Sequence, residues 1–361
     1  MNDANELISF IASMSGEGNL RVEENLGEGY VRLRVSEAER RQAKHDIQHV
    51  EDIVIEMLRN ARDAGADKVY LATTKEDGVR TLVFLDNGSG VPQDMQERIF
   101  DARVTSKLES MKMDRWGVHG RGMALFSIKQ NTDEARVVAS DVDLGSVFKV
   151  SVATDRLGER ADQSSWPQAV KDEDGHYVCA RGPHNIIRAA CEFALEELRA
   201  CDVYLGSPSE IAATLHAQAS SRLDASRLLF IDDEAELPVV DRLGLASDAE
   251  DFIRICSGLG LEMSERTAHR ILAGQIKPVR GVTARLLRER DSSSHASAQV
   301  DLAKDRRGLR IAKDDMAQFS RAVERDFNDL ASRYYLNLCG DPKIRVSRDR
   351  ITVTFDIAKE E

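Results

Sequence analysis

The sequence predicts an α/β fold, built as a two-layer sandwich in which helices lie on one face of a mixed sheet. Short runs rich in β-branched and aromatic residues, separated by turn signals, indicate the strands of this sheet. A long run with the period of an amphipathic helix precedes them. Hairpins between successive strands are too frequent for a doubly wound sheet, in which helices separate parallel strands. A smaller helical domain, and then a C-terminal helix with a β-hairpin, are expected after the sandwich.

The elements of the sandwich follow one another in chain order. Alternation at residues 29–35 predicts a strand, and residues 36–62 predict one long helix that ends at an Ala-Gly-Ala run. A further helix is expected at residues 92–100. The remaining strands are expected at residues 68–73, 81–85, 135–139 and 146–153.

The composition changes after residue 154, where the polar residues 156–174 predict a loop or an insertion. Two strands and two helices are expected after it, at residues 177–180, 183–199, 203–205 and 209–219. We place this part at the rear of the first domain, which is predicted to span residues 1–215.

Residues 216–290 are predicted to form a second region that is helical and basic. Helices are expected at residues 248–257, 264–273 and 279–290. The basic residues between positions 264 and 290 are Arg266, Arg270, Lys277, Arg280, Arg285, Arg288 and Arg290. Short helices with a tight turn and a basic surface are typical of helix-turn-helix modules, so residues 264–290 are the predicted DNA contact. A solvated helical bundle with basic edges is the alternative.

The last predicted region spans residues 291–361. A serine-rich segment comes first, and a long helix is expected at residues 314–337. Residues 344–346 and 351–357 alternate in the manner of two strands, which predicts a terminal hairpin.

Composition limits the classes of protein that fit. Hydrophobic residues make up 42% of the 361 residues, enough for a packed core, and no run approaches the ~20 apolar residues of a membrane helix. The N-terminal run MNDANELISF lacks the basic and apolar parts of a signal peptide. The five cysteines are scattered, which favours reduced thiols and a cytoplasmic protein without a membrane partner. The net charge of −12 argues against nucleic-acid binding by the whole surface, although it leaves room for a local basic patch.

The run EMLRNARDA carries the most specific chemical pattern. Glu56, Asn60 and Asp63 are spaced by four and three residues, so they share one face of a helix. A carboxylate base, a neutral oxygen ligand and a second carboxylate on one face suit the activation of a water molecule beside magnesium. An ordinary amphipathic helix with a polar face is the alternative.

Two glycine-containing motifs follow. An apolar run ends in Asp86, with Gly88 and Gly90 after it, and so brings a carboxylate and two flexible glycines to a sheet end. A hairpin turn is the alternative for this Asn-Gly sequence. The second motif, GVHGRGM, contains Gly117, Gly120, Arg121, Gly122 and Met123. Glycines at this spacing before a helix are typical of a phosphate cradle made of backbone N–H groups.

Together these motifs resemble those of the GHKL ATPase superfamily, named for gyrase, the heat-shock chaperone, histidine kinases and MutL, over roughly residues 40–155. The resemblance implies the Bergerat-type ATP-binding fold, with ATP and Mg²⁺ as the bound cofactors. It implies that Glu56 polarises the attacking water, that Asn60 holds the magnesium ion and that Asp86 accepts a hydrogen bond from the adenine amino group. It also implies a mobile lid formed by the glycine segment. Ser146 stands where the family's fourth motif has threonine.

The segment ARVTSK before the glycine motif resembles the A-T-S-K segment of MutL and the G-S-K segment of the topoisomerase VI B subunit. The resemblance adds Thr105 and Ser106 to the nucleotide-binding residues and gives Lys107 the role of a cation beside the phosphates. A solvated lysine is the alternative. Glu56 favours the branches that hydrolyse ATP, because histidine kinases usually lack a glutamate there. His45 begins a run that resembles a kinase phosphoacceptor, but we expect a solvated histidine on the same helix as Glu56.

The sequence therefore predicts a magnesium-dependent ATPase whose nucleotide state gates dimerisation or partner contacts. In the first hypothesis it acts in a DNA transaction as a topoisomerase VI B-like subunit. Its partners would be a second copy on ATP binding, a separate catalytic subunit, and DNA through residues 264–290. A nucleotide-gated interaction protein without DNA binding and a histidine-kinase-like phosphotransferase are the alternatives.

Overall fold

The computed structural model describes most of residues 22–287 and parts of the C-terminal region. The described residues are 22–106, 112–114, 117–119, 122–198, 200–223, 233–287, 316, 319–320, 322–324, 327, 331, 336–340, 342–346 and 351–359. The chain divides into two compact units, residues 1–293 and residues 294–361.

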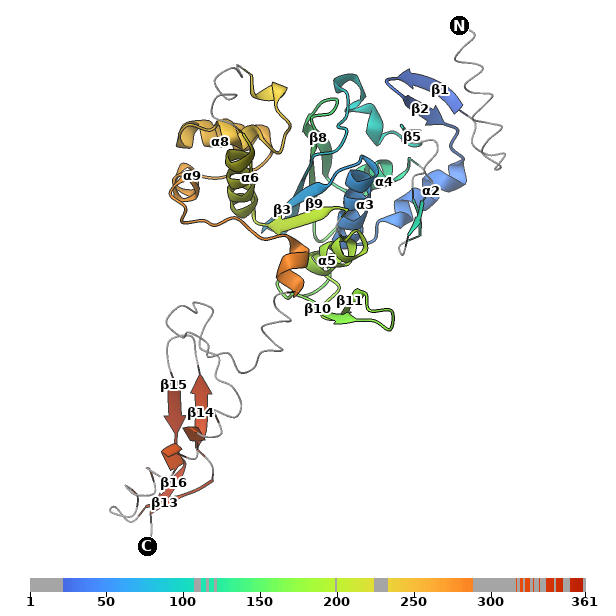
Figure 1. Cartoon of the computed structure of the whole chain (residues 1–361). Coiled ribbons are helices and arrows are strands. Elements are labelled where there is room, and N and C mark those ends of the chain that lie inside the picture. The colour runs from blue at the N-terminus through green and yellow to red at the C-terminus, as the bar shows by residue number, and fades with distance from the viewer. Residues whose placement is uncertain are drawn as a thin grey trace. The chain divides into compact units, whose positions relative to one another are not determined.

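A five-stranded mixed sheet lies at the centre of the first unit (Figure 1). In spatial order its strands are β12 (Asp202–Gly206), β3 (Lys68–Glu76), β4 (Val79–Asp86), β9 (Ser146–Ala153) and β8 (Glu134–Ser140). β12 pairs parallel with β3, and the other neighbours pair antiparallel. The strands expected from the sequence are confirmed with small differences at their ends, and so is the α/β class.

Helices α3 (Val50–Asp63), α4 (Ala124–Asn131) and α5 (Ile186–Glu196) lie on one face of this sheet. Apolar side chains of α3 at helical spacing, such as Ile53 and Met57, are buried with Leu71 and Phe84 of the sheet. Each large apolar side chain that is fully buried contributes about 1.5–3 kcal/mol, so packing rather than helix propensity holds α3 in place. Asn185 caps α5 by accepting a hydrogen bond from the N–H of Arg188 at 2.8 Å.

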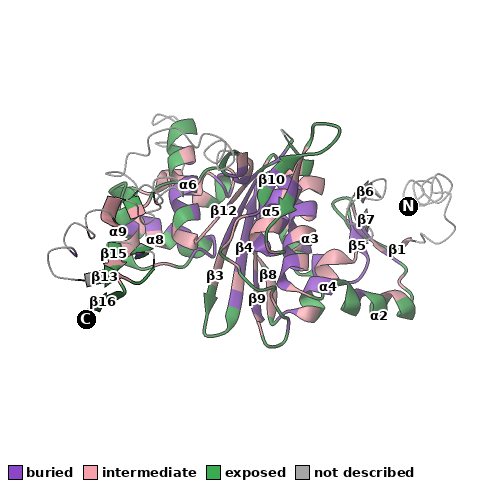
Figure 2. Ribbon diagram, turned by 90° about the horizontal axis from the view of Figure 1, so that it is seen from below, coloured by how far each residue is buried: buried purple, intermediate pink, exposed green. Residues whose placement is uncertain are grey.

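The opposite face of the sheet is covered by helices that follow β12. In a second apolar cluster, Tyr70 and Val83 of the sheet meet residues of α6 (Pro208–Arg222), α8 (Ala249–Gly258) and α9 (Glu265–Leu272). Figure 2 shows the buried strands between helices on both sides. The helical region thus adds a third layer to the expected sandwich. α6 also runs across residue 215, where the second region was expected to begin.

The single helix expected at residues 36–62 is wrong, because two helices form there. α2 (Glu37–Asp46) begins at a capping box made by Ser36 and Glu39, and three residues separate the end of α2 from the start of α3. The chain turns because the Asp52 carboxylate accepts the N–H groups of Gln48 and His49, both at 2.8 Å. His45 therefore lies on α2 and not on the helix of Glu56.

The helix expected at residues 92–100 is also wrong. Two short 3₁₀ turns, Gln93–Met95 and Arg98–Phe100, occupy this segment. Between them the Gln96 side chain donates to the Ser140 carbonyl at 2.9 Å, and Met95 is fully buried. These contacts hold the segment against the end of β8 as two short turns instead of one continuous helix.

Two small groups of short strands include residues from the part of the chain that follows these turns. β1 (Val22–Gly27) and β2 (Tyr30–Leu33) form a hairpin, and β5 (Val104–Thr105) adds to its edge as a third strand. β6 (Lys112–Asp114) and β7 (Gly117–His119) pair as a separate ribbon. The N-terminal hairpin therefore lies beside Val104 and Thr105, which belong to the ARVTSK segment before the glycine motif.

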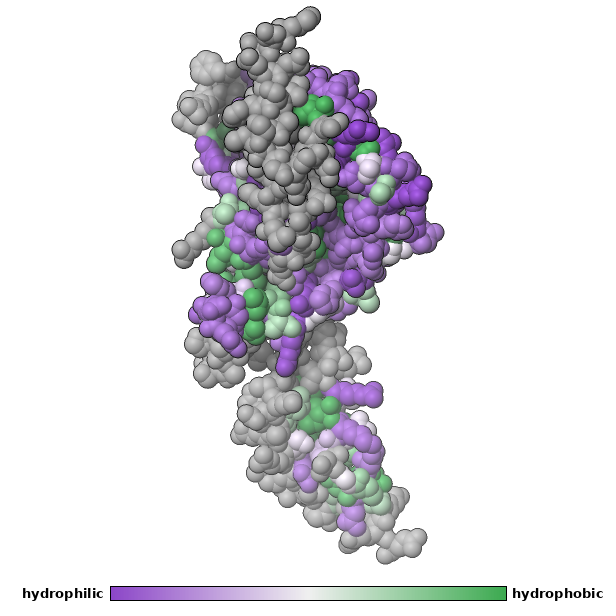
Figure 3. All heavy atoms as spheres, turned by 90° about the vertical axis from the view of Figure 1, so that its right-hand side faces the viewer, coloured by the Kyte–Doolittle hydropathy of each residue, from purple (hydrophilic) through white to green (hydrophobic). Residues whose placement is uncertain are grey.

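The rest of the first unit agrees broadly with the sequence. The loop or insertion expected at residues 156–174 contains a strand, β10 (Gln168–Lys171), which pairs as a hairpin with β11 (Tyr177–Arg181), the strand expected at residues 177–180. Residues 282–287 are helical, and residues 288–290 of the helix expected there lie outside the described residues. On the side shown in Figure 3, the described surface of this unit is mostly hydrophilic.

In the second unit, β14 (Lys343–Val346) and β15 (Ile351–Thr354) pair antiparallel, which confirms the terminal hairpin. The helix expected at residues 314–337 ends early, because Leu336–Leu338 is β13, which pairs with β16 (Ile357–Lys359). Among the residues that the structure describes, no helix combines the length and the apolar character that crossing a membrane requires.

Candidate functional site

A cavity of about 570 Å³ lies between α3, the ends of β4 and β9, and the start of α4. It collects most of the residues that the sequence motifs predicted for the site. Those that line it are Glu56, Asn60, Asp63, Asp86, Gly90, Thr105, Ser106, Gly122, Met123 and Ser146. Gly88 and Gly117 do not line it, and Gly117 lies in β7. Lys107, Gly120 and Arg121 lie outside the described residues.

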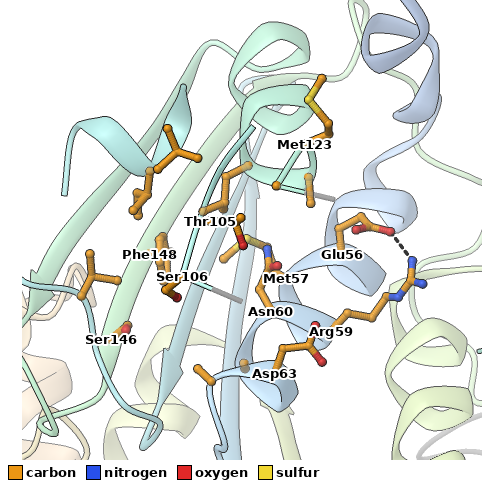
Figure 4. A pocket seen from close by; sticks show the side chains of 18 of the residues that line it. Glu56, Met57, Arg59, Asn60, Asp63, Thr105, Ser106, Met123, Ser146 and Phe148 are labelled. Carbon is orange, nitrogen blue, oxygen red and sulfur yellow. Dashed lines mark hydrogen bonds and ion pairs between the residues drawn. The ribbon is translucent and has the colours of Figure 1, made fainter. Parts of the chain in front are cut away.

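One face of α3 forms a wall of the cavity, as the spacing of its polar residues predicts. Glu56, Asn60 and Asp63 follow one another along this wall (Figure 4). The Nδ2 atom of Asn60 is buried and has no hydrogen-bond partner among the described residues. Because the oxygen and nitrogen of an amide are assigned from such partners, this side chain can present its oxygen to a cation.

The end of β4 forms the opposite part of the cavity. Asp86 is buried, and its Oδ1 atom accepts the N–H of Gly88 at 2.8 Å. Ser146, the first residue of β9, is the strand partner of Asp86 and is also buried. A carboxylate and a hydroxyl fixed at one sheet end can recognise a planar ligand that offers both donors and acceptors.

Ser140 belongs to this sheet end and was missed by sequence reasoning. Its Oγ atom donates to the Gly145 carbonyl at 2.8 Å and lies 3.2 Å from the Oγ atom of Ser146. The same oxygen accepts the N–H of Val91 at 2.8 Å. Ser140 thus ties the glycine turn after Asp86 to the turn before Ser146. A single serine at the end of a strand gives no signal of such a role.

The glycine motif brings the N-terminus of α4 to the cavity. Met123 is the N-cap residue without a side-chain capping bond, and Met123 and Ala124 both line the cavity. Gly122 has φ +67°, and its carbonyl accepts the N–H of Arg103 at 2.8 Å. The first N–H groups of a helix carry partial positive charge, so this end of the cavity suits an anion.

Three lining residues come from elements N-terminal to every motif: Tyr30 on β2, and Gln42 and Asp46 on α2. Burial raises the pKa of the Tyr30 phenol, and a hydrogen bond with the Ser106 side chain opposes this shift. The sequence carries no signal for these residues, because only the packing of the hairpin and α2 against the lid segment brings them here.

Arg59 is a second kind of residue that sequence reasoning missed. Its Nη1 atom donates to the Oε1 atom of Glu56 at 2.6 Å (Figure 4). The spacing of three residues on one helix was the available signal.

The charge of the cavity is mostly negative. Asp46, Glu56, Asp63 and Asp86 line it, and Arg59 is the basic residue among the described lining residues. Carboxylate and amide oxygens are the ligands that magnesium prefers, and a polyphosphate would need a cation to approach this wall. The oxygen-rich donor set and the Asn60 side chain, whose Nδ2 atom has no hydrogen-bond partner among the described residues, therefore fit a magnesium-bound nucleotide.

The predicted DNA-contacting residues lie away from this cavity. Arg266 and Arg270 are exposed on α9, at a shallow hollow that is also lined by His269 and Gln275. The Arg285 guanidinium lies 3.9 Å from the centre of the Trp166 ring. Arg288 and Arg290 lie outside the described residues.

Comparison with known proteins supports the reading of the motifs. Residues 47–140 match the family described as histidine kinase-, DNA gyrase B-, and HSP90-like ATPases. The chain is also similar to the DNA mismatch repair protein MutL of Staphylococcus aureus, in strains Newman, JH1 and Mu3. Each of these is 28% identical over 136 residues, which cover 35% of this chain and 20% of the relative. The resemblance to the GHKL ATPases is therefore confirmed, and this chain spans about a fifth of the length of the curated relatives it matches.

Proposed function

We propose, from the GHKL ATPase segment at residues 47–140, that this protein binds ATP with magnesium and hydrolyses it. The observation that carries the proposal is the convergence of three separate motifs on one cavity. Glu56 and Asn60 of α3, Asp86 of β4 and the N-terminus of α4 all line it. A chance set of polar residues is not expected to combine a base, an oxygen ligand, a carboxylate at a sheet end and a helix N-terminus that suits an anion.

The proposed binding mode places adenine at Asp86 and Ser146 and the phosphates between Asn60 and the start of α4. Asn60 would hold magnesium through its amide oxygen, with Asp63 beside it. Magnesium, when bound, compensates the charge of the phosphates. Thr105, Ser106 and the glycine segment would close over them, and Lys107 would add a positive charge.

In the proposed reaction, Glu56 orients a water molecule and accepts its proton as the water oxygen attacks the γ-phosphorus. The bond from that phosphorus to the bridging oxygen breaks, and ADP and phosphate are the products. The N–H groups at the start of α4 stabilise the charge that develops on the phosphate oxygens.

The direct test uses the purified full chain. Binding of ATP and of a non-hydrolysable analogue is measured by calorimetry, with magnesium and with a chelator in its place. Release of phosphate is followed under the same conditions. Binding that requires magnesium, followed by slow phosphate release, is expected. Absence of nucleotide binding in both conditions would contradict the proposal.

A second proposal concerns the output of the ATPase. The similarity to a mismatch repair protein and the exposed arginines of α9 support a role in a DNA transaction. Because the ARVTSK segment resembles one in the topoisomerase VI B subunit, we propose that the chain acts as such a subunit with a separate catalytic partner. ATP would then close a homodimer. The test measures DNA binding against salt concentration for the wild type and for a variant with Arg266→Ala and Arg270→Ala. Each lost phosphate contact should reduce, by about 0.9, the slope of the logarithm of the binding constant against the logarithm of the salt concentration.

Arg41→Ala is the matched control for that test, because Arg41 is an exposed arginine on α2. Nucleotide-dependent association without any effect of DNA would favour an interaction protein instead. Transfer of the γ-phosphoryl group to the protein would favour a histidine-kinase-like phosphotransferase. The cytoplasmic location remains a prediction.

A further inference from the structure

A buried ion-pair cluster joins the catalytic face of α3 to the ribbon β6–β7. Arg59 is 3% exposed and binds two carboxylates at once. Its Nη1 atom donates to Glu56 at 2.6 Å, while its Nε and Nη2 atoms donate to the two oxygens of Asp114, both at 2.9 Å. One guanidinium therefore lies between the proposed catalytic base and a residue of β6.

Asp114 is held from a second side. The Nη1 atom of Arg62 donates to it at 3.3 Å and to Glu197 of the turn after α5 at 3.1 Å. The Nε atom of Arg62 donates to Asp63 at 3.1 Å. The side chains of Asp114 and Arg62 are 7% and 10% exposed, so water screens these pairs little.

The geometry gives each partner a distinct effect. A bidentate pair between a guanidinium and a carboxylate fixes the relative orientation of the two groups as well as their distance, because two parallel hydrogen bonds must form at once. Asp114 therefore fixes where the guanidinium of Arg59 lies, and that guanidinium fixes the carboxylate of Glu56. Asp114 also compensates a positive charge that would otherwise act on Glu56 alone and weaken it as a base.

We propose that Asp114 and Arg59 are positioning residues for Glu56, and that docking of the ribbon β6–β7 through Asp114 sets the base for hydrolysis. The inference rests on the proposed ATPase function. Neither residue is required to touch ATP in the ground state. Loss of Asp114 should therefore lower turnover and leave nucleotide affinity nearly unchanged.

The experiment compares Asp114→Asn, which keeps the size of the side chain, with Asp114→Glu, which keeps its charge. The turnover number for ATP and the dissociation constant of a non-hydrolysable analogue are measured for each. Asp114→Asn should lower turnover by about tenfold or more, the scale expected when a catalytic group is slightly misplaced, with affinity within about threefold. Asp114→Glu should recover a large part of the rate.

Glu197→Gln is the matched control. It removes another carboxylate of the same cluster, the one that accepts a hydrogen bond from the Nη1 atom of Arg62 at 3.1 Å. It should change turnover by less than about twofold, which is within the usual effect of a pair at the edge of a cluster. Thermal unfolding of every variant reports whether the fold is kept. If Asp114→Asn does not fold, Arg59→Lys is measured in its place. Lysine keeps the positive charge of Arg59 but cannot form the two parallel hydrogen bonds of a guanidinium.

Three outcomes overturn the inference. If Asp114→Asn hydrolyses ATP at the wild-type rate, the positioning role is contradicted, while the proposed ATPase function stands. If Asp114→Asn loses turnover and nucleotide affinity equally, the positioning role is also contradicted, since Asp114 would then have a role in binding or folding. A wild type that binds ATP and never hydrolyses it removes the proposed hydrolysis itself, and the inference with it.

Discussion

The carbonyl oxygen of Asp141 lies so close to Gly90 that a Cβ atom on Gly90 would stand 1.8 Å from it. Gly90 also has φ +72°, in the left-handed region that side chains disfavour. A matching contact occurs on the other side of the turn, where a Cβ atom on Gly145 would lie 2.1 Å from the carbonyl oxygen of Asp86. Two loops thus meet at backbone contact distance beside Asp86 and Ser146.

Gly90→Ala is therefore expected to destabilise the fold and to distort the end of the cavity that Asp86 and Ser146 line. Gly175→Ala is the control, since Gly175 has φ +82° with no atom within 4 Å of its added Cβ. Both variants incur the cost of the left-handed conformation, and only Gly90→Ala adds a clash. The free energy of unfolding in urea should fall at least about 2 kcal/mol further for Gly90→Ala. Equal losses would contradict the close contact.

Asp86→Asn should weaken ATP binding and keep the fold. Asparagine can still accept the Gly88 N–H through its oxygen, so the turn survives. The proposed charge-assisted hydrogen bond to the adenine amino group is lost, at a cost of roughly 1.5–3 kcal/mol, or about tenfold to a hundredfold in affinity. Calorimetry with ATP measures the change. An unaltered affinity would remove Asp86 from the nucleotide site.

Glu56→Ala should separate binding from hydrolysis. The base does not anchor ground-state ATP, so affinity should stay within a few-fold while turnover drops on the order of a hundredfold or more. Asn60→Ala should instead lose the dependence of binding on magnesium. Steady-state phosphate release and calorimetry on both variants check this pair of outcomes. Wild-type turnover by Glu56→Ala would mean that another group acts as the base.

The free energy of unfolding should fall in acid, partly because the Glu159 carboxylate becomes protonated. Burial raises the pKa of this carboxyl, but hydrogen bonds from Arg80 and Lys75, at 2.8 and 2.7 Å, outweigh it and leave the pKa below its ordinary value of 4.5. Since the folded pKa is lowered, the stabilisation is present above pH 4.5 and is lost as the pH falls through the folded pKa. Urea unfolding of wild type and Glu159→Gln should therefore differ at pH 7 and converge in acid. A constant difference would contradict the assignment.

The residues of the site that could be predicted from sequence are those whose spacing alone fixes their placement. Glu56, Asn60 and Asp63 share a helix face, and Asp86 ends a strand, whatever surrounds them. Tyr30 and Asp114 come from other parts of the chain, and their approach to the site depends on how the hairpin and the ribbon pack. Local patterns do not contain that information.

The fold was predictable to a similar extent. Alternation and turn signals located the strands, whereas the break before α3 depends on a capping interaction of Asp52 within an otherwise helical pattern. The second helical layer did have a signal. Val69 and Leu71 face one side of the sheet while Tyr70 and Ala72 face the other, and all four are buried. An unbroken apolar run of this kind is typical of a strand that is covered on both faces.

The cover on the second face has a practical consequence for dissecting this protein. A chain cut after residue 215 would lose part of α6 and all of α8 and α9, and would leave Tyr70, Val83 and Leu85 in contact with water. A contiguous apolar patch on a sheet is a template for self-association. The ATPase motifs end well before that residue, but a fragment holding only them should aggregate when expressed alone, whereas a fragment that extends to residue 293 keeps its sheet sealed.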